Sequence, residues 1–521
     1  MSDGQPLDGV LAVHRVMSGT GRCVRAVGAA LAVLALATAS CTGGGAAPMF
    51  RPALRWEQCP SDVDIQYFTR HRCGWLTVLQ DRSEPAGMTV RLLVVETWPV
   101  GETPLPGFIS DFGSDLGNSY SYSDKAAGAT RTRHIGVTLE LRGTGHSEPS
   151  LACPEVDALD PRDARAPTGD GSLLRDFLAA VAACHDRLTA QGVDPTDYDI
   201  QNVVQDMEDL RVALGTDRWA FSDSYGTNSR YLFEYLREFP DRVGGIWMDS
   251  PQFPQLDEVS DGIDGTRYAL AQLFMACSTD GRCAKAYPDL PALWARALTR
   301  LEQRPLHGPV TVDAGKLLRA ARLVLGGDSP DNLTRFPAMI AAAAQGRLDP
   351  GLARTLAKDP LFCAGYRPSC TGVGVQGFSL GAYLTVLCRD EAPFIDRTAL
   401  ARDARGDPTF EAVFVRDPYL AACKQWDVAP ADPAVHQPGG TDVPELLFLG
   451  RFDSFSPLPV AREAAKTFGN AWVLEVPGQT HNALGFSDCP IGIRNAWIQD
   501  PTSPPVDTTC LRDMGIHFNT K

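Results

Sequence analysis

Short apolar segments, rich in β-branched and aromatic residues and bounded by turn residues, recur along this chain. Segments of this kind predict β-strands. The expected strands are residues 75–79, 89–96, 108–110, 135–141, 219–222, 244–248, 445–449 and 472–476. Apolar positions with helical spacing lie between several of them, at 203–214, 229–238 and 459–468. Strands that alternate with helices indicate a mostly parallel sheet, with the first two strands as an antiparallel edge.

This alternation stops in the middle of the chain, where residues 251–435 consist mainly of helices and loops. The helices expected there are 268–276, 290–301, 314–325 and 336–344. In open α/β sheets, ligands bind beyond the carboxyl ends of the strands. We therefore expect the helical segment to form a cap over that edge, inserted between the sixth and seventh strands. The core then comprises residues 51–250 and 436–521, a division that suits a chain of 521 residues.

The N-terminal segment has the composition of an export signal. Basic residues precede an apolar run at 26–39, and small residues lead from there to Cys41. This run is too short for a comfortable membrane-spanning helix. The residues ending at Cys41 are similar to a bacterial lipobox, although 37–39 also fits an ordinary cleavage site. We expect a signal at 1–41, a tether at 42–50, and export with a lipid on Cys41 as the anchor in the membrane; simple secretion is the alternative.

Charge and cysteine content narrow the function classes. A net charge of -15 argues against a nucleic-acid partner, which would need clustered Lys and Arg. Beyond Cys23 and Cys41, the exported part of the chain carries an even number of cysteines, which predicts disulfides. They fall into neighbouring couples: Cys59 with Cys73, Cys153 with Cys184, Cys277 with Cys283, Cys363 with Cys370, Cys388 with Cys423, and Cys489 with Cys510. No C-x-x-C, H-E-x-x-H or P-loop motif occurs, so we expect no metal and no cofactor.

Ser224 has the sequence context of a nucleophile. It lies between a predicted strand and a predicted helix, in the segment Ser222-Asp223-Ser224-Tyr225-Gly226. A serine on a sharp turn at this point projects its hydroxyl into the site, and the backbone N–H of Tyr225 can hold the oxyanion. Ser222 replaces the glycine that usually stands two residues before the nucleophile. Small side chains are needed there, and serine is nearly as small.

A literal G-x-S-x-G occurs elsewhere, around Ser379. A glycine-rich loop within the expected cap precedes it, and no strand leads into it. The same loop spells G-x-G-x-x-G from 372 to 377, which without a preceding strand is a weak dinucleotide signal. We therefore expect Ser224 to be the nucleophile, with Ser379 as the alternative.

A serine nucleophile needs a base and an acid that orients the base. His481 follows the last predicted strand, whereas His146 comes before Ser224 and breaks the chain order of serine, acid and histidine. Asp453 follows the seventh strand and is the expected acid. Asp249, at the end of the sixth strand, is the alternative.

Together these residues resemble the exported tripeptidyl aminopeptidase-like branch of the α/β-hydrolases, a bacterial group that includes proline iminopeptidase relatives. The matching segments, in chain order, are Trp56 with Cys59 to Cys73, Arg142 to Gly145 with Ser147, Cys153 to Glu155, Asp209 to Arg211, Ser224 to Thr227, Cys388 with Asp390, Cys423 with Trp426, Asp453, His481, and Cys489 to Cys510. The resemblance implies an α/β-hydrolase fold and a serine peptidase acting on free N-termini. The acidic cap residues Asp390 and Glu391 are then candidates to bind the substrate's ammonium group.

One segment departs from the family. Relatives carry a glycine-rich turn after the third strand, whose backbone N–H groups face the substrate; here it reads Ser110-Asp111-Phe112-Gly113. The resemblance implies that the N–H of Phe112 is the second oxyanion donor. Two carboxylates in or next to this segment, Asp111 and Asp115, would oppose the oxyanion if they pointed inward. Three functions follow: a peptidase, a hydrolase of small esters on the same site, or a cell-surface binding protein with a degenerate site.

Overall fold

The computed structural model describes residues 50–61, 63, 70–99, 103–111, 133–159, 168–256, 259–326, 330–357, 379–485, 487–505 and 507–520. The strands within these ranges form one sheet in the order β1-β2-β3-β5-β4-β6-β7-β8-β9. Their bounds are β1 Ala53–Glu57, β2 Arg70–Leu79, β3 Thr89–Trp98, β4 Phe108–Asp111, β5 Ile135–Leu139, β6 Phe221–Tyr225, β7 Ile246–Asp249, β8 Glu445–Gly450 and β9 Ala471–Val476.

Strands β4 to β9 are parallel, and β1 to β3 form the antiparallel end of the sheet. The antiparallel pairing of the first two predicted strands, β2 and β3, is confirmed. The sequence did not predict β1, the edge strand that pairs with β2. Most of its residues are exposed, so it lacks the apolar alternation that marks a half-buried strand.

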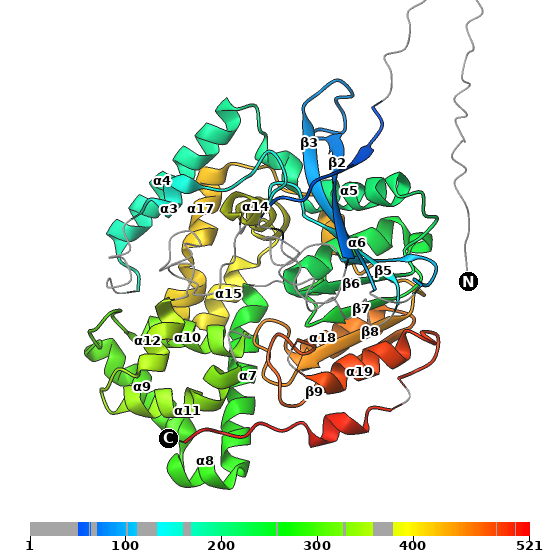
Figure 1. Ribbon diagram of the computed structural model, residues 1–521. Helices are drawn as coiled ribbons and strands as arrows, with labels where there is room; N and C mark the ends of the chain where they lie inside the picture. The colour runs from blue at the N-terminus through cyan, green and yellow to red at the C-terminus, as the bar shows by residue number, and fades with distance from the viewer. Residues whose placement is uncertain are drawn as a thin grey trace, which may run out of the picture. The chain divides into compact units, whose positions relative to one another are not determined.

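Alternate residues of the central strands point to opposite faces. In β7, Ile246 and Met248 join the core beneath helices α5 (Ile200–Ala213) and α6 (Ser229–Glu238). Trp247 faces the other way, into a core that includes residues of α19 (Asp488–Trp497). Figure 1 shows α19 and α6 on opposite sides of the sheet. Burial on both faces explains why these strands are apolar throughout.

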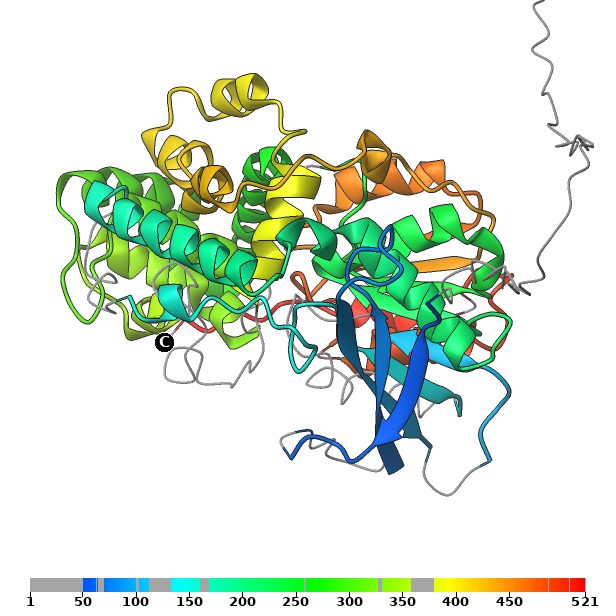
Figure 2. The ribbon, with the colours of Figure 1, turned by 90° about the horizontal axis from the view of Figure 1, so that it is seen from above.

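The segment between β7 and β8 is mainly helical, as the sequence predicted. Its first helices are α7 Ser260–Thr279, α8 Gly281–Ala286, α9 Leu290–Gln303, α10 Ala314–Leu325, α11 Pro330–Ala344 and α12 Pro350–Ala357. Their apolar faces share a core that is separate from the two sheet cores. In Figures 1 and 2 the helices from α9 to α12 lie to one side of the sheet.

Helix α4 (Gly171–Ala190), which the sequence did not predict, packs against α17 (Pro418–Trp426) from the later helical segment. Their contact includes the edge-on rings of Phe177 and Tyr419, 5.6 Å apart. Both helices contribute to the same core as the sheet. The two helices also lie side by side in Figures 1 and 2. A segment before Ser224 and a segment after β7 therefore belong to one helical layer.

Five of the predicted disulfides are present: Cys59–Cys73, Cys153–Cys184, Cys277–Cys283, Cys388–Cys423 and Cys489–Cys510. The sixth couple, Cys363 with Cys370, lies outside the described residues, as do Cys41 and the rest of the expected signal. Within the described ranges, no helix combines the length and the apolar character needed to cross a membrane.

Candidate active site

Ser224 is the fourth residue of β6 and lies beside Met248 of β7. Its side chain is buried, and its Oγ has no hydrogen-bond partner among the described residues. The chain leaves the strand through Gly226, whose φ of 55° is in the left-handed region that glycine adopts without strain. A 3₁₀ turn at Gly226–Asn228 then leads into α6. The expected order of strand, turn and helix is present, and the turn residue with a positive φ, Gly226, lies two residues after Ser224.

Asp453 and His481 are in direct contact. The Nδ1 atom of His481 lies 3.0 and 3.1 Å from the two carboxylate oxygens of Asp453. Asp453 is fully buried, and its Oδ1 also accepts the backbone N–H groups of Phe455 and Ser456 at 2.8 and 2.9 Å. A carboxylate can only accept from Nδ1–H, so a neutral His481 keeps its lone pair on Nε2. This is the tautomer that a general base in a serine hydrolase needs.

The ring of His481 also lies next to β6, the strand that carries Ser224. Its centroid is 5.1 Å from that of Tyr225, the residue after Ser224, and 5.1 Å from that of Phe455. Ser224, Asp453 and His481 are all at the carboxyl ends of parallel strands, namely β6, β8 and β9. The structure therefore brings together the strand ends that carry the three predicted residues.

Asp249, the alternative acid, contacts the histidine loop instead of the histidine ring. Its Oδ1 accepts the backbone N–H of Ala483 at 2.7 Å, and its Oδ2 accepts that of Leu484 at 2.9 Å. Burial raises the pKa of Asp249 to about 6, although both N–H groups and the nearby His481 act to lower it. Both oxygens are thus engaged away from Nδ1, the atom that the acid of a triad binds.

Ser379 caps a helix. Its Oγ accepts the backbone N–H of Ala382 at 3.3 Å, at the start of α14 (Leu380–Thr385). Gly381 of the same motif packs so closely on Leu151 that a Cβ would lie 2.3 Å from its carbonyl oxygen. Gly381 therefore allows the close packing of α14 on Leu151, and Ser379 has the N-cap role that serine favours.

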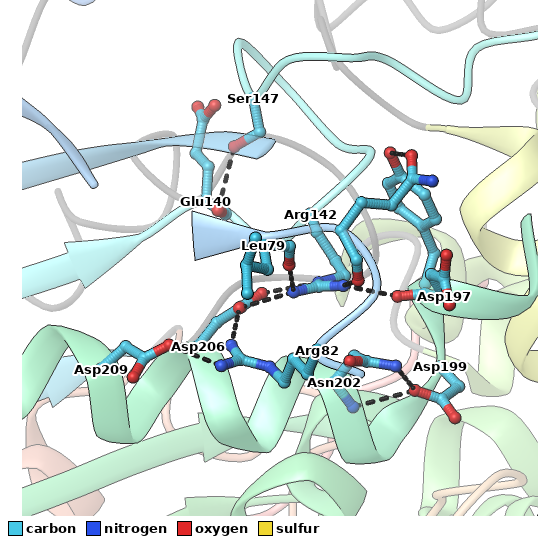
Figure 3. Close-up of polar contacts among 12 residues, drawn as sticks. Leu79, Arg82, Glu140, Arg142, Ser147, Asp197, Asp199, Asn202, Asp206 and Asp209 are labelled. Atoms are coloured by element: carbon cyan, nitrogen blue, oxygen red, sulfur yellow. Dashed lines mark hydrogen bonds and ion pairs between the residues drawn. The ribbon is translucent and has the colours of Figure 1, made fainter. Parts of the chain in front are cut away.

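His146, the other histidine considered as a base, interacts with Glu140. Its backbone N–H and its Nδ1 lie 2.5 and 3.2 Å from the carboxylate oxygens of Glu140. Ser147 donates its hydroxyl to the carbonyl oxygen of Glu140 at 3.0 Å (Figure 3). These contacts close the loop after β5 onto itself.

Arg142, in the R-G-T-G segment, is fully buried and holds several chain segments together. Its guanidinium makes two hydrogen bonds of 2.7 Å to Asp206 of α5 (Figure 3). It also donates to the carbonyl oxygens of Leu79, Gln80 and Asp197, at 3.2, 3.0 and 2.6 Å. The residues of this motif therefore connect β2, the loop after β5 and α5. The sequence contained no signal for these partners, since they lie far apart along the chain.

The expected ammonium-binding residues are both buried. Glu391 forms an ion pair with Arg230 of α6. Asp390 accepts the backbone N–H of Ile200 through Oδ2 at 3.4 Å, and its Oδ1 has no hydrogen-bond partner in the described part of the chain. Burial and the nearby Asp199 raise the pKa of Asp390 to about 8. Phe112, expected as an oxyanion donor, lies outside the described residues.

Comparison with known proteins shows which family and which proteins this chain is similar to. Residues 407–510 match the family described as TAP-like protein. The curated tripeptidyl aminopeptidases of Streptomyces lividans and Streptomyces coelicolor are each 27% identical to this chain over 238 residues, or 41% of this chain and 41% of theirs. This chain thus spans about two fifths of the length of these relatives. Among solved structures, the proline iminopeptidase-related protein of Thermus thermophilus is 15% identical, covering 84% of this chain and 100% of its own, with a TM-score of 0.34.

The sheet order, the flanking helices and the family match define the class of this protein as an α/β-hydrolase, as the sequence predicted. Within that class, the chain is similar to the tripeptidyl aminopeptidase-like branch, through its residues 407–510 and through the two Streptomyces relatives. The predicted resemblance is thereby confirmed.

Proposed function

We propose that this protein is an exported serine hydrolase in which Ser224 is the nucleophile, His481 the general base and Asp453 the acid. The contact between His481 Nδ1 and the buried Asp453 carboxylate carries the proposal. With the proton on Nδ1, the lone pair of Nε2 can take the proton of Ser224, whose hydroxyl has no hydrogen-bond partner among the described residues. Attack by Ser224 on a carbonyl carbon would give an acyl-enzyme, with the N–H of Tyr225 as one oxyanion donor and that of Phe112 as the other.

The proposed substrates are short peptides with a free N-terminus. Support comes from the likeness to the two tripeptidyl aminopeptidases and from the TAP-like family match. A cap formed by the helices between β7 and β8 would restrict entry, which favours short peptides over folded proteins. The disulfides support export, because such bonds persist in oxidising compartments. Anchoring through a lipid on Cys41 is the proposed localisation.

The test begins with a fluorophosphonate probe. Wild type and Ser379→Ala, the matched control with the literal motif, should be labelled, whereas Ser224→Ala should not. Each variant is then assayed on free and N-acetylated tripeptide anilides and on a short-chain ester. Equal cleavage of free and blocked peptides would remove the aminopeptidase proposal, and turnover of the ester alone would favour an esterase. A wild type that neither reacts nor turns over would favour the binding protein.

Asp390 is the proposed contact for the substrate's ammonium group, because Arg230 already neutralises Glu391. Asp390 has no exposed surface and a pKa raised to about 8, so this proposal requires the helices around it to separate, and its carboxyl to lose its proton, when the substrate enters. Asp390→Asn should raise KM for the free tripeptide anilide and leave the ester's KM unchanged. Equal changes for both substrates would indicate a structural role instead.

A further inference from the structure

Asp249 ends strand β7 with both carboxylate oxygens bound to the loop that carries His481. The two N–H donors, Ala483 and Leu484, follow the histidine by two and three residues. A carboxylate that accepts two adjacent N–H groups restrains both the position and the direction of that backbone. All three contacting residues are buried, so water does not compete for these hydrogen bonds.

The next residue, Ser250, connects the same end of β7 to the loop that carries Asp453. Its φ of 51° is in the left-handed region, which is uncommon for a residue with a side chain. Its hydroxyl donates to Asp249 Oδ1 at 3.0 Å, and its carbonyl oxygen accepts the hydroxyl of Ser456 at 3.0 Å. Ser456 belongs to the loop of Asp453 and donates its own N–H to that carboxylate. The unusual backbone at Ser250 thus accompanies a direct contact to the loop of Asp453 and, through the side chain of Asp249, an indirect one to the loop of His481.

We infer that Asp249 is a positioning residue that holds His481 in place through the backbone of its loop, while Ser250 ties the loop of Asp453 to the same strand end. This inference rests on the proposed function, because it takes His481 as the general base. It assigns no substrate contact to Asp249. Without the two hydrogen bonds, the imidazole would keep Asp453 as a partner but lose its fixed distance from Ser224. A displacement of about 1 Å costs on the order of a hundredfold in rate. The carboxylate charge near His481 would also favour the imidazolium that forms during the reaction.

The test is Asp249→Asn. Asparagine keeps the shape of the side chain, but its NH₂ group cannot accept a hydrogen bond. One of the two hydrogen bonds from the backbone of the histidine loop is therefore replaced by a contact between two donors. The expected result is a kcat lower by about 10- to 100-fold, with KM changed less than about twofold. Glu445→Gln is the matched control, since Glu445 is a buried carboxyl on the adjacent strand β8, and should keep the wild-type kcat. Ser456→Ala should lower kcat severalfold and gives a second test if Asp249→Asn does not fold.

A double variant separates positioning from general stability. If Asp249 acts through His481, then His481→Ala and His481→Ala with Asp249→Asn should have the same residual rate. A further loss in the double variant, an unchanged kcat in Asp249→Asn, or a change confined to KM would overturn the inference. Failure of the proposed function looks different, because wild type itself then shows no Ser224-dependent turnover. In that case the proton resonance of the His481 Nδ1–H decides, since Asp249→Asn should shift or broaden it and Glu445→Gln should not.

Discussion

Two carboxylates, Asp453 and Asp249, stand at the ends of neighbouring strands within reach of the loop of His481. The two carboxylates differ in the donors of the hydrogen bonds that they accept. Asp453 contacts the ring nitrogen, whereas Asp249 contacts only backbone N–H groups of that loop. Both are buried, so each needs these donors to offset the cost of removing its charge from water.

Asp453→Asn should reduce kcat by about 10⁴-fold, because an amide cannot hold the Nδ1–H tautomer of His481 or stabilise the imidazolium. Steady-state kinetics on a free tripeptide anilide would measure the loss, with labelling of Ser224 by the fluorophosphonate probe slowed in parallel. Asp249→Asn is the comparison. A larger loss in Asp249→Asn than in Asp453→Asn would make Asp249 the catalytic acid.

At the scale of elements, a buried ion-pair network joins α5 to the antiparallel end of the sheet. Asp206 of α5 binds Arg142 and also Arg82, at 2.5 Å, and Arg82 reaches Asp209 at 2.7 Å (Figure 3). Because α5 precedes β6 in the chain, this network positions the helix that leads into the strand of Ser224.

Arg142→Met should destabilise the protein by about 3–5 kcal/mol, since it leaves the Asp206 carboxylate buried with one guanidinium fewer. Urea unfolding monitored by tryptophan fluorescence would measure this. The control is Arg91→Ala, which removes an exposed pair with Glu148 and should cost about 0–1 kcal/mol. Equal costs for the two variants would show that the network contributes no more than a surface ion pair.

At the scale of the whole molecule, several buried acids have raised pKa values. Burial raises the pKa of Glu445 and of Asp390 to about 8, and that of Asp223 to about 7. Each of these groups is protonated in the folded protein over a pH range in which it is ionised in the unfolded chain. Their contribution to stability is therefore complete below the ordinary carboxyl pKa near 4, and is lost as the pH rises toward 8.

We therefore expect the free energy of unfolding to fall between about pH 5 and pH 8, by up to about 1.4 kcal/mol per pH unit for each group. Glu445→Gln should flatten this dependence and raise stability at pH 8. Denaturant titrations at a series of pH values would test this. Stability that rises over the same interval would contradict it.

The amino-acid sequence by itself determined the parts of this protein that depend on local pattern. The continuous apolar runs of the strands and the 3.6-residue period of the helices report which residues are buried, so the parallel sheet and the helical segment were predictable. Ser224, Asp453 and His481 were predictable as candidates because each lies a few residues beyond the end of a predicted strand. Neighbouring cysteines paired for a similar reason, since short loops bring them close.

Only the tertiary structure decided which distant segments meet. Strand β1 was missed because its exposed residues carry no apolar period, and its place depends on pairing with β2. The position of α4 against α17 was likewise not encoded in either helix alone. Asp249 shows the same limit within the site, since its partners lie more than two hundred residues away. A local pattern specifies how each element is buried, but contacts across the chain depend on how all elements pack together. Those contacts distinguish Asp453, which binds the ring of His481, from Asp249, which binds only the backbone of the same loop.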